Sequence, residues 1–155
     1  MSRRTRNIIL GILGLGIIVF VIFQIIPAGS INADFASPGN PPVTYEIKWD
    51  SPETEKLARA ACFDCHSNET RYPWYSNIAP VAWLVNHDIN EARRKMNFSI
   101  GSKLFSDQME KQIESGAMPK PYYLPLHPEA NLTDAQKKQL IDGLIATFGE
   151  DDFNG

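Results

Sequence analysis

The chain has 155 residues, with 15 lysines and arginines, 18 aspartates and glutamates and a formal net charge of −3. This length accommodates one soluble domain and a short appendage. Three of the arginines precede the first acidic residue, so the rest of the chain has 12 basic and 18 acidic residues. A protein that binds nucleic acid needs a basic surface, and this balance therefore argues against a nucleic-acid partner.

Residues 8–26 are predicted to span a membrane. They carry no charge, and Gln24 is their one polar side chain. As a helix they would be about 28 Å long at roughly 1.5 Å per residue, close to the hydrocarbon thickness of a bilayer. Arginines at positions 3, 4 and 6 predict that residues 1–7 are cytoplasmic and that the remainder is exported. A signal peptide cleaved near residues 28–30 is the alternative, although its apolar region is usually only about 7–15 residues long.

Residues 27–49 are predicted to form a tether between the anchor and the folded domain. They contain four prolines and two glycines and show no helical period. Such a segment is partly extended and semi-stiff. We expect the folded domain to occupy residues 50–149, and the acidic residues 150–155 to form a frayed tail.

The domain is predicted to be almost entirely helical. Its first helix begins either with the pair Asp50 and Glu53 or with Ser51-Pro52, and continues through Cys62. A second helix is expected over residues 81–96. A third is expected over residues 106–115, with glycine 116 as its C-cap.

The C-terminal part of the domain combines a proline-rich loop with a last helix. Residues 117–128 include four prolines and are expected to be extended. The last helix opens with a capping box formed by Thr133 and Gln136. Its predicted buried stripe consists of Leu140, Ile141, Leu144, Ile145 and Phe148. Because no strand pairs are predicted, the fold class is all-α.

The sequence Cys62-Phe63-Asp64-Cys65-His66 is the motif that carries chemistry. It has the C-x-x-C-H form of a c-type haem attachment site and uses both cysteines of the chain. On a helix, positions i, i+3 and i+4 share one face, so Cys62, Cys65 and His66 project together. The two thiols can then form thioethers with the haem vinyl groups, and His66 can bind the iron as proximal ligand. The predicted cofactor is one covalently attached haem c.

Other chemistries of the same residues are less consistent with the pattern. A disulfide between Cys62 and Cys65 would close a very small loop and would leave His66 unexplained. A thioredoxin-like dithiol follows a strand, whereas this motif follows an alanine-rich helix. Zinc could take Cys62, Cys65, His66 and His87, but the adjacent Cys65 and His66 are poorly placed to bind one tetrahedral ion.

Met118 is the predicted distal ligand of the iron. It lies in Gly116-Ala117-Met118-Pro119, a proline-stiffened loop, and a thioether ligand raises the reduction potential. Packing in the core is the commoner role of a methionine. His87 is the alternative ligand and would lower the potential. His127 is expected to bond a haem propionate or to fix the proline-rich loop.

An unusual density of aromatic residues follows the motif. Aromatic side chains under a long loop commonly form a small core of their own. A haem also needs an apolar wall, and residues close to the attachment site in sequence can supply it. The predicted haem wall therefore consists of Tyr72, Trp74, Tyr75 and Trp83, with Arg71 as a candidate counter-ion of the propionates.

The order of these features resembles class I cytochrome c, in which the first and last helices cross beside the haem. In more detail, the chain is similar to the bacterial haem-binding domain family. That resemblance covers residues 40–148 and rests on Asn40-Pro41-Pro42, Trp49-Asp50-Ser51-Pro52, residues 61–69, residues 72–81, Asn97-Phe98-Ser99, Met118-Pro119 and His127-Pro128. The chain departs from the family where Glu91-Ala92-Arg93 replaces an expected glycine-arginine pair. The resemblance therefore does not fix the residue at which the second helix ends. The resemblance implies a cytochrome c-like helical domain with His66 and Met118 as the axial pair.

These observations predict a membrane-tethered monohaem c-type cytochrome. It would be held in a bacterial inner membrane by one helix, with the haem domain in the periplasm or an equivalent exported space. There it would pass single electrons between redox protein partners. The alternative is a haem-based sensor or a peroxidase-like enzyme with an open distal site. The sequence contains no convincing distal His–Arg catalytic pair, and His87 with Arg93 or Arg94 is the combination that it leaves open.

Overall fold

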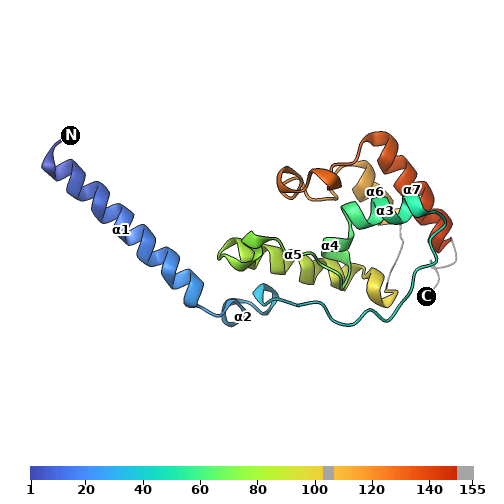
Figure 1. Ribbon diagram of the computed structural model, residues 1–155, viewed down its shortest axis with the longest axis horizontal. Helices are drawn as coiled ribbons and strands as arrows, with labels where there is room; N and C mark the ends of the chain where they lie inside the picture. Colours follow the sequence, from blue (N-terminus) through green and yellow to red (C-terminus); the bar gives the residue numbers. More distant parts are fainter. Residues whose placement is uncertain (103–106, 150–155) are drawn as a thin grey trace. The chain divides into compact units, whose positions relative to one another are not determined.

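The structure is a computed structural model that describes residues 1–102 and 107–149. The predicted acidic tail, residues 150–155, and the predicted start of the third helix at residue 106 lie outside these ranges. Within them the chain forms seven α-helices joined by 3-10 turns and loops (Figure 1), and it contains no β-strand beyond an isolated bridge between Asn97 and Ser102. The all-α prediction is confirmed.

The chain divides into two compact units. The first comprises Met1–Ser37 and Tyr72–Asp88, and the second comprises Pro38–Arg71 and the residues from Ile89 onward. Helix α5, Val81–Lys95, contributes its beginning to the first unit and its end to the second.

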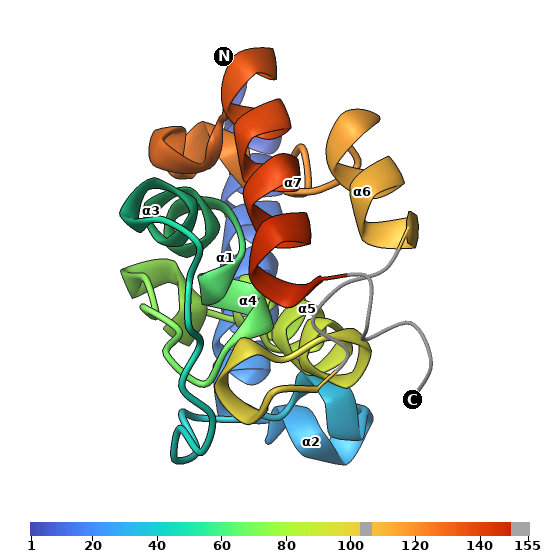
Figure 2. The same ribbon diagram turned by 90° about the vertical axis from the view of Figure 1, so that its right-hand side faces the viewer.

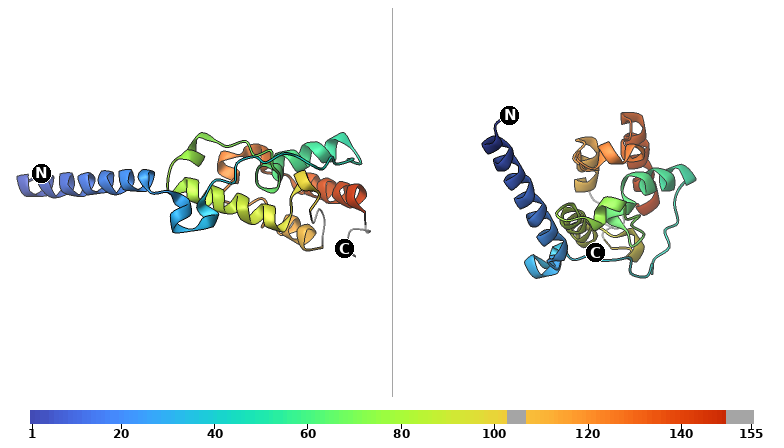
Figure 3. Two further views of the ribbon diagram at one scale, coloured as in Figure 1. Left: turned by 90° about the horizontal axis from the view of Figure 1, so that it is seen from below. Right: turned by 60° about the vertical axis from the view of Figure 1, so that its left-hand side comes forward.

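The first unit is built on α1, Arg3–Ile25, an uninterrupted helix drawn in blue in Figure 3. None of its residues is buried, and it is long and apolar enough to cross a membrane. Ser2 caps its N-terminus by accepting a hydrogen bond from the backbone N–H of Thr5. Past α1 the unit contains α2, Ala28–Ile31, and two 3-10 turns, Ala33–Phe35 and Trp74–Asn77.

The predicted tether is therefore more structured at its start than its composition indicated. Short helical turns occupy much of residues 28–35, and Asn32 caps the second of them by accepting a hydrogen bond from the N–H of Asp34. The asparagine cap is a local signal that the count of prolines and glycines overlooked. Residues 36–49 have no regular secondary structure, as expected.

The second unit packs its helices around one apolar core. Helix α3, Pro52–Ala61, lies beside α7, Asp134–Phe148, and α6, Asp107–Glu114, packs on the other side of α7 (Figure 2). The core contains buried aliphatic side chains and the stacked rings of Phe63 and Phe98, whose centroids are 4.9 Å apart. Its buried members are Leu57, Ala58, Phe63, Met96, Phe98, Ile113, Leu132, Leu140, Ile141 and Leu144.

Local capping signals explain where these helices begin and end. Ser51 caps α3 by accepting from the N–H of Thr54, so the Ser51-Pro52 alternative is the one the structure contains. Thr133 and Gln136 form the predicted capping box of α7. Gly116 follows α6 with a φ of +70°, a left-handed conformation that glycine adopts without strain. The departure from the family pattern at Ala92-Arg93 does not shorten α5. This helix ends within one residue of the predicted boundary.

Close contact between α3 and α7 depends on Gly143. A Cβ atom at this position would overlap the hydroxyl of Thr54 and lie 2.7 Å from its Cγ2 atom. At the end of α7, the hydroxyl of Thr147 donates to the Asp50 carboxylate over 3.0 Å and accepts from the Asp50 N–H. The start of α3 is thus tied to the end of α7.

Two predictions about the C-terminal part need correction. Ile145 was placed in the buried stripe of α7 but is 37% exposed, because the core takes Leu140, Ile141 and Leu144 instead. The proline-rich loop is not fully extended, since 3-10 turns form at Leu124–Leu126 and Pro128–Ala130. Proline is compatible with the first position of such a turn, where no N–H is needed.

Candidate functional site

The C-x-x-C-H motif lies on a turn of its own. Helix α3 ends at Ala61, Cys62 has φ −124° and ψ −37°, and a separate helix α4 covers Phe63–His66. The prediction of one helix running through the motif is therefore wrong. The predicted spacing is nevertheless kept, because the N–H groups of Cys65 and His66 donate to the Cys62 carbonyl over 3.2 and 2.8 Å. Cys62 and His66 are thus one helical turn apart.

Both cysteine side chains are half-buried and neither is in a disulfide. Burial raises the pKa of the Cys62 thiol to about 12, and the neighbouring Cys65 adds to the effect. The thiol of Cys62 is therefore protonated at neutral pH.

His66 is oriented by the C-terminal end of α5. Its Nδ1 atom lies 3.2 Å from the carbonyl oxygen of Met96. A carbonyl can only accept a hydrogen bond, so Nδ1 carries the proton and Nε2 carries the lone pair. Burial lowers the pKa of His66, and this outweighs the opposing effect of the Met96 and Ala92 carbonyls. The imidazole is consequently neutral, which is the form that binds metal.

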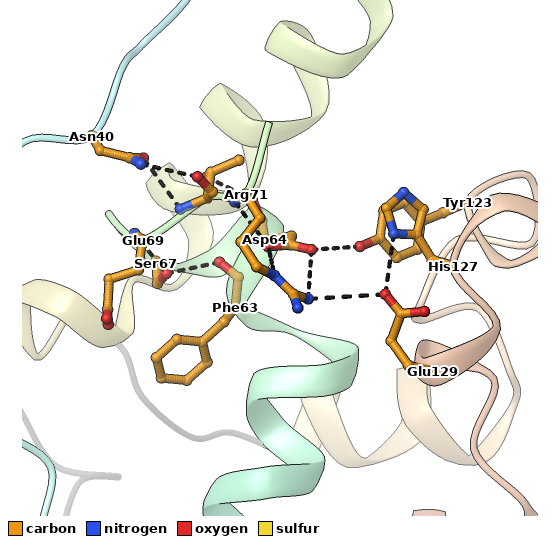
Figure 4. Close-up of polar contacts among 10 residues, drawn as sticks. Asn40, Phe63, Asp64, Ser67, Glu69, Arg71, Tyr123, His127 and Glu129 are labelled. Atoms are coloured by element: carbon orange, nitrogen blue, oxygen red, sulfur yellow. Dashed lines mark hydrogen bonds and ion pairs between the residues drawn. The ribbon is translucent and has the colours of Figure 1, made fainter. Parts of the chain in front are cut away.

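Asp64, between the two cysteines, is the centre of a hydrogen-bonded cluster (Figure 4). Arg71 donates to it from the backbone N–H, from Nε and from Nη2 over 3.0 to 3.1 Å. Tyr123 donates its phenolic hydroxyl over 2.9 Å to Oδ2 of the same carboxylate, the oxygen that also accepts from Arg71 Nη2. Charge-assisted bonds of this kind are stronger than neutral ones. They fix Asp64, and with it the turn that bears the cysteines.

The cluster continues towards the proline-rich loop. The rings of Tyr123 and His127 stack with centroids 3.8 Å apart and planes 6° apart. Glu129 lies 3.4 Å from His127 and 4.0 Å from Arg71, which completes the ring of contacts in Figure 4. His127 is nearly buried in this arrangement. The predicted roles of His127 and Arg71 towards a propionate remain predictions.

A second group of contacts holds the residues that follow the motif. Arg93 of α5 donates to the carbonyls of Ser67 and Gly39 over 2.8 Å each. It also donates to the side chains of Asn40 and Thr70 over 3.1 Å each. One guanidinium therefore joins α5, the start of the second unit and residues 67–70. The donors of Arg93 are used for structure, which does not favour the catalytic pairing with His87 that the sequence leaves open.

Three further polar residues complete the support of this stretch. Asn68 donates to the Pro42 carbonyl and accepts from the amide of Asn97 over 3.0 Å. The hydroxyl of Ser99 accepts from the N–H of Asn68 over 2.8 Å. All three side chains are buried. We call residues 62–71 the attachment segment, since these bonds fix it along its whole length.

Met118 lies in the loop after α6. Its backbone N–H donates to the Gln112 carbonyl over 3.0 Å, and its side chain is half-buried. The bond fixes the backbone of the loop two residues beyond Gly116. The assignment of Met118 as distal ligand remains a prediction.

The predicted haem-wall residues and His87 belong to the first unit, whereas Cys62, Cys65, His66 and Met118 belong to the second. Within the first unit, Trp83 packs between Phe23 and Phe35, with ring centroids 5.3 and 6.0 Å away. His87 contacts the edge of Phe35, and its Nδ1 atom is 4.0 Å from the Asp34 carboxylate. Trp74 is 77% exposed. The haem-wall role of Tyr72, Trp74, Tyr75 and Trp83 is still a prediction, as is the ligand role of His87.

A cleft of about 660 Å³ lies beside the attachment segment. It is lined by Phe63 and Asp64, the two residues between the cysteines, and by charged residues of α3 and the loops. The Arg59 guanidinium lies 4.5 Å from the centre of the Phe63 ring and is paired with Glu55. Cys62, Cys65 and His66 do not line this cleft. In the part of the chain described, no three His, Cys, Asp or Glu side chains are grouped to hold a metal ion.

Sequence reasoning did not identify Asp64, Arg93 and Tyr123 as supporting residues. The Asn40-Pro41-Pro42 and Asn97-Phe98-Ser99 stretches were noted only as points of resemblance, and their partners in space were not predicted. A signal was present, because asparagine, serine and threonine cluster in residues 67–70 and 97–99. Such side chains commonly bond to backbone groups in irregular segments.

Comparison with known proteins gives one result for this chain. The model of a family described as a haem-binding domain matches residues 18–146. No curated protein and no solved structure matches the chain. The matched range includes the end of α1, the whole attachment segment and most of α7.

Proposed function

Because the chain belongs to the haem-binding domain family, and is therefore a haem-binding protein, we propose that it is a membrane-tethered monohaem c-type cytochrome. Its function would be to pass single electrons between protein partners. The observation that carries this proposal is the turn at residues 62–66, with His66 held by the Met96 carbonyl.

The residues of this turn suit a covalently bound haem. Neither cysteine is in a disulfide, and the backbone bonds of Cys65 and His66 to the Cys62 carbonyl fix the spacing of the motif. Each thiol would add its sulfur and its hydrogen across one vinyl double bond, so no oxidant or leaving group is needed. A bond from metal-bound histidine to a carbonyl is the usual way of fixing its tautomer and ring orientation.

Met118 is the proposed distal ligand. Its loop is tied to α6 by the bond to Gln112, and the thioether needs no deprotonation to bind iron. Haem iron supplies one-electron chemistry by changing between the ferric and ferrous states. A rigid ligand set favours electron transfer. Residues that do not move between the ferric and ferrous states keep the reorganisation energy of the transfer small. The bonds that Arg93, Asp64 and Asn68 make would provide that rigidity around the attachment segment.

The location of the protein is proposed from its N-terminus. Helix α1 has three arginines before its apolar stretch, which favours a cytoplasmic N-terminus and an exported second unit. The proposed site is a bacterial inner membrane with the haem domain in the periplasm. Covalent attachment suits an exported protein, since the cofactor cannot be lost. The electron partners would be other redox proteins.

The test uses the full chain, produced with haem-maturation machinery and purified in detergent. Covalent haem is checked by the mass increase, and a redox titration is recorded for the parent, Met118→Ala and Met109→Leu. Met109 packs against the core and is the matched control. We expect Met118→Ala to lose the long-wavelength band of methionine bound to ferric iron. Its potential should fall by on the order of 0.1 V, within the roughly 0.8 V over which axial ligands tune haem potentials.

The same experiment separates the proposed function from a haem enzyme. If Met118→Ala keeps the band, Met118 is not a ligand. If the parent lacks the band and turns over peroxide rapidly, the iron has an open distal site and the chain is a peroxidase-like enzyme instead. Colourless protein without the mass increase would exclude covalent haem altogether.

A further inference from the structure

The end of α1 is joined to the segment Tyr72–Asp88, which we call the aromatic segment. Gln24, the one polar side chain of the predicted span, donates from Nε2 to the Ala79 carbonyl over 3.0 Å. Its Oε1 atom accepts from the Ala79 N–H, also over 3.0 Å. Phe23 adds a ring contact with Trp83 at 5.3 Å. Both backbone groups of Ala79 are therefore bonded to the helix that is apolar enough to cross a membrane.

These contacts set the height of the aromatic segment relative to a bilayer. Gln24 is two residues from the end of the apolar stretch, or about 3 Å along a helix axis. The end of a spanning helix lies in the interfacial layer, where the headgroups begin. Ala79, in hydrogen-bond contact with Gln24, must then lie at the same level.

The composition of the aromatic segment fits that position. Residues 72–87 contain no lysine, arginine, aspartate or glutamate. Several large apolar side chains in it are exposed: Trp74 by 77%, Leu84 by 47% and Val81 by 44%. Val81 and Leu84 are three residues apart on α5 and so share one face. Exposed tryptophan and tyrosine are typical of the water–lipid interface, where the ring is apolar and the polar group stays hydrated.

We propose that the aromatic segment is a membrane-contacting surface, with Trp74, Val81 and Leu84 in the interfacial layer of the bilayer that α1 crosses. This inference rests on the proposed membrane anchoring, and its ligand is the lipid surface itself. Because the segment has no lysine or arginine, its attachment depends on apolar area and does not require anionic lipid. The proposal competes with the haem-wall prediction for Trp74, and one measurement decides between them.

The test uses the haem-loaded full chain in vesicles of phosphatidylcholine, with and without brominated acyl chains, which quench nearby tryptophan. The chain has three tryptophans, at positions 49, 74 and 83. The ratio of emission in the two kinds of vesicle cancels constant quenching by haem. We expect Trp74→Phe to reduce the bromine-dependent quenching about twofold, since exposed tryptophan favours the interface. Trp49→Phe is the matched control: Trp49 packs on Phe63, Phe98 and Phe148 in the second unit, so its removal should raise the quenched fraction.

A double variant keeps the fluorophore in place. Val81→Asp with Leu84→Asp adds two charges to the exposed face, and quenching of Trp74 should fall although the indole remains. High salt and the absence of anionic lipid should leave the quenching of the parent unchanged, because no lysine or arginine is involved.

The outcomes distinguish this inference from the proposed function. Co-flotation of the chain with vesicles after a carbonate wash reports anchoring by α1. If the chain floats and bromine quenches the parent and Trp74→Phe equally, Trp74 does not face lipid and is left for a protein partner, which overturns the inference alone. If the chain does not float, anchoring fails and the inference fails with it. Loss of haem in Trp74→Phe would support the haem wall and contradict the lipid contact.

Discussion

The attachment segment and the aromatic segment follow each other in sequence but are held by different forces. Residues 62–71 are fixed by hydrogen bonds that Arg93, Asn97 and Tyr123 donate and by one that the Ser99 hydroxyl accepts from the Asn68 N–H. Residues 72–88 are held by ring contacts of Trp83 together with hydrogen bonds of Gln24 and Asn86. Directional bonds impose one geometry, whereas ring packing tolerates small displacements.

The difference matches what each segment is proposed to do. A site that holds iron between fixed ligands needs side chains within a narrow range of positions, and a shell of hydrogen bonds provides this. A surface in contact with lipid needs apolar area and few charges. The change occurs between Arg71, which binds Asp64 with three donors, and Tyr72, where the uncharged stretch begins.

Removing the Arg93 side chain should have the largest effect on the attachment segment. Arg93→Ala leaves the carbonyls of Ser67 and Gly39 without their donor, and we expect a loss of about 3 kcal/mol of unfolding free energy. Chemical unfolding of the haem-loaded full chain in micelles measures it. The control is Arg94→Ala, whose exposed pair with Glu91 should contribute less than about 1 kcal/mol. Equal losses in the two variants would show that hydrogen bonding from α5 does not hold the segment.

The contact between α3 and α7 is the next most sensitive point of the second unit. A methyl group in Gly143→Ala would overlap Thr54, and we expect a loss of about 2 kcal/mol from overpacking. In α1, Gly14→Ala meets no atom within 4 Å and should not destabilise the chain. Adding Thr54→Ala to Gly143→Ala should recover part of the loss. Without any recovery, the cause would lie outside this contact.

How far the sequence predicts these features depends on the range of the interaction. Caps are local: Ser51-Pro52, Thr133 with Gln136 and Gly116 were all predicted from a few neighbouring residues and are confirmed. The all-α class follows from the same signals. The break at Cys62 was missed, because the alanine-rich sequence before it favours helix and only the backbone angles of Cys62 separate α3 from α4.

Contacts between residues far apart in the chain cannot be predicted from sequence patterns. Arg93 bonds to residues 23 to 54 positions away, and Tyr123 bonds to Asp64 across 59 positions. No periodicity links such residues, so their partners appear only when the chain is folded. The motif itself was readable, because its spacing is local. The roles of Cys62, Cys65 and His66 in haem binding remain predictions that the family assignment makes testable.

The bond from Tyr123 to Asp64 predicts a smaller, pH-dependent effect. Burial, followed by the Asp64 carboxylate, raises the pKa of Tyr123 above its ordinary value of 10.0. The stability that the neutral phenol contributes is therefore complete below about pH 10 and is lost as the pH rises towards the folded-state pKa. Tyr123→Phe should lose about 1 kcal/mol at neutral pH and should show a shallower decline above pH 10.

The control for this variant is Tyr122→Phe, at a side chain that is 52% exposed. It should keep both the neutral-pH stability and the alkaline decline of the parent. Denaturant midpoints recorded between pH 7 and 11 compare the three proteins. Parallel pH profiles for Tyr123→Phe and the parent would mean that Tyr123 does not cause the alkaline loss.

The smallest expected effect is local and lies in the aromatic segment. Gln24→Leu keeps α1 apolar but removes the acceptor of the Ala79 N–H, so amide exchange at Ala79 should be faster by roughly fivefold, or about 1 kcal/mol of local opening. Exchange in the attachment segment should not change, because its bonds do not involve Gln24. Hydrogen–deuterium exchange of the full chain in nanodiscs resolves the two segments. If Ala79 exchanges at the parental rate, the hydrogen bonds of Gln24 do not hold the aromatic segment to α1, and its height at the membrane must then depend on the contact between Phe23 and Trp83.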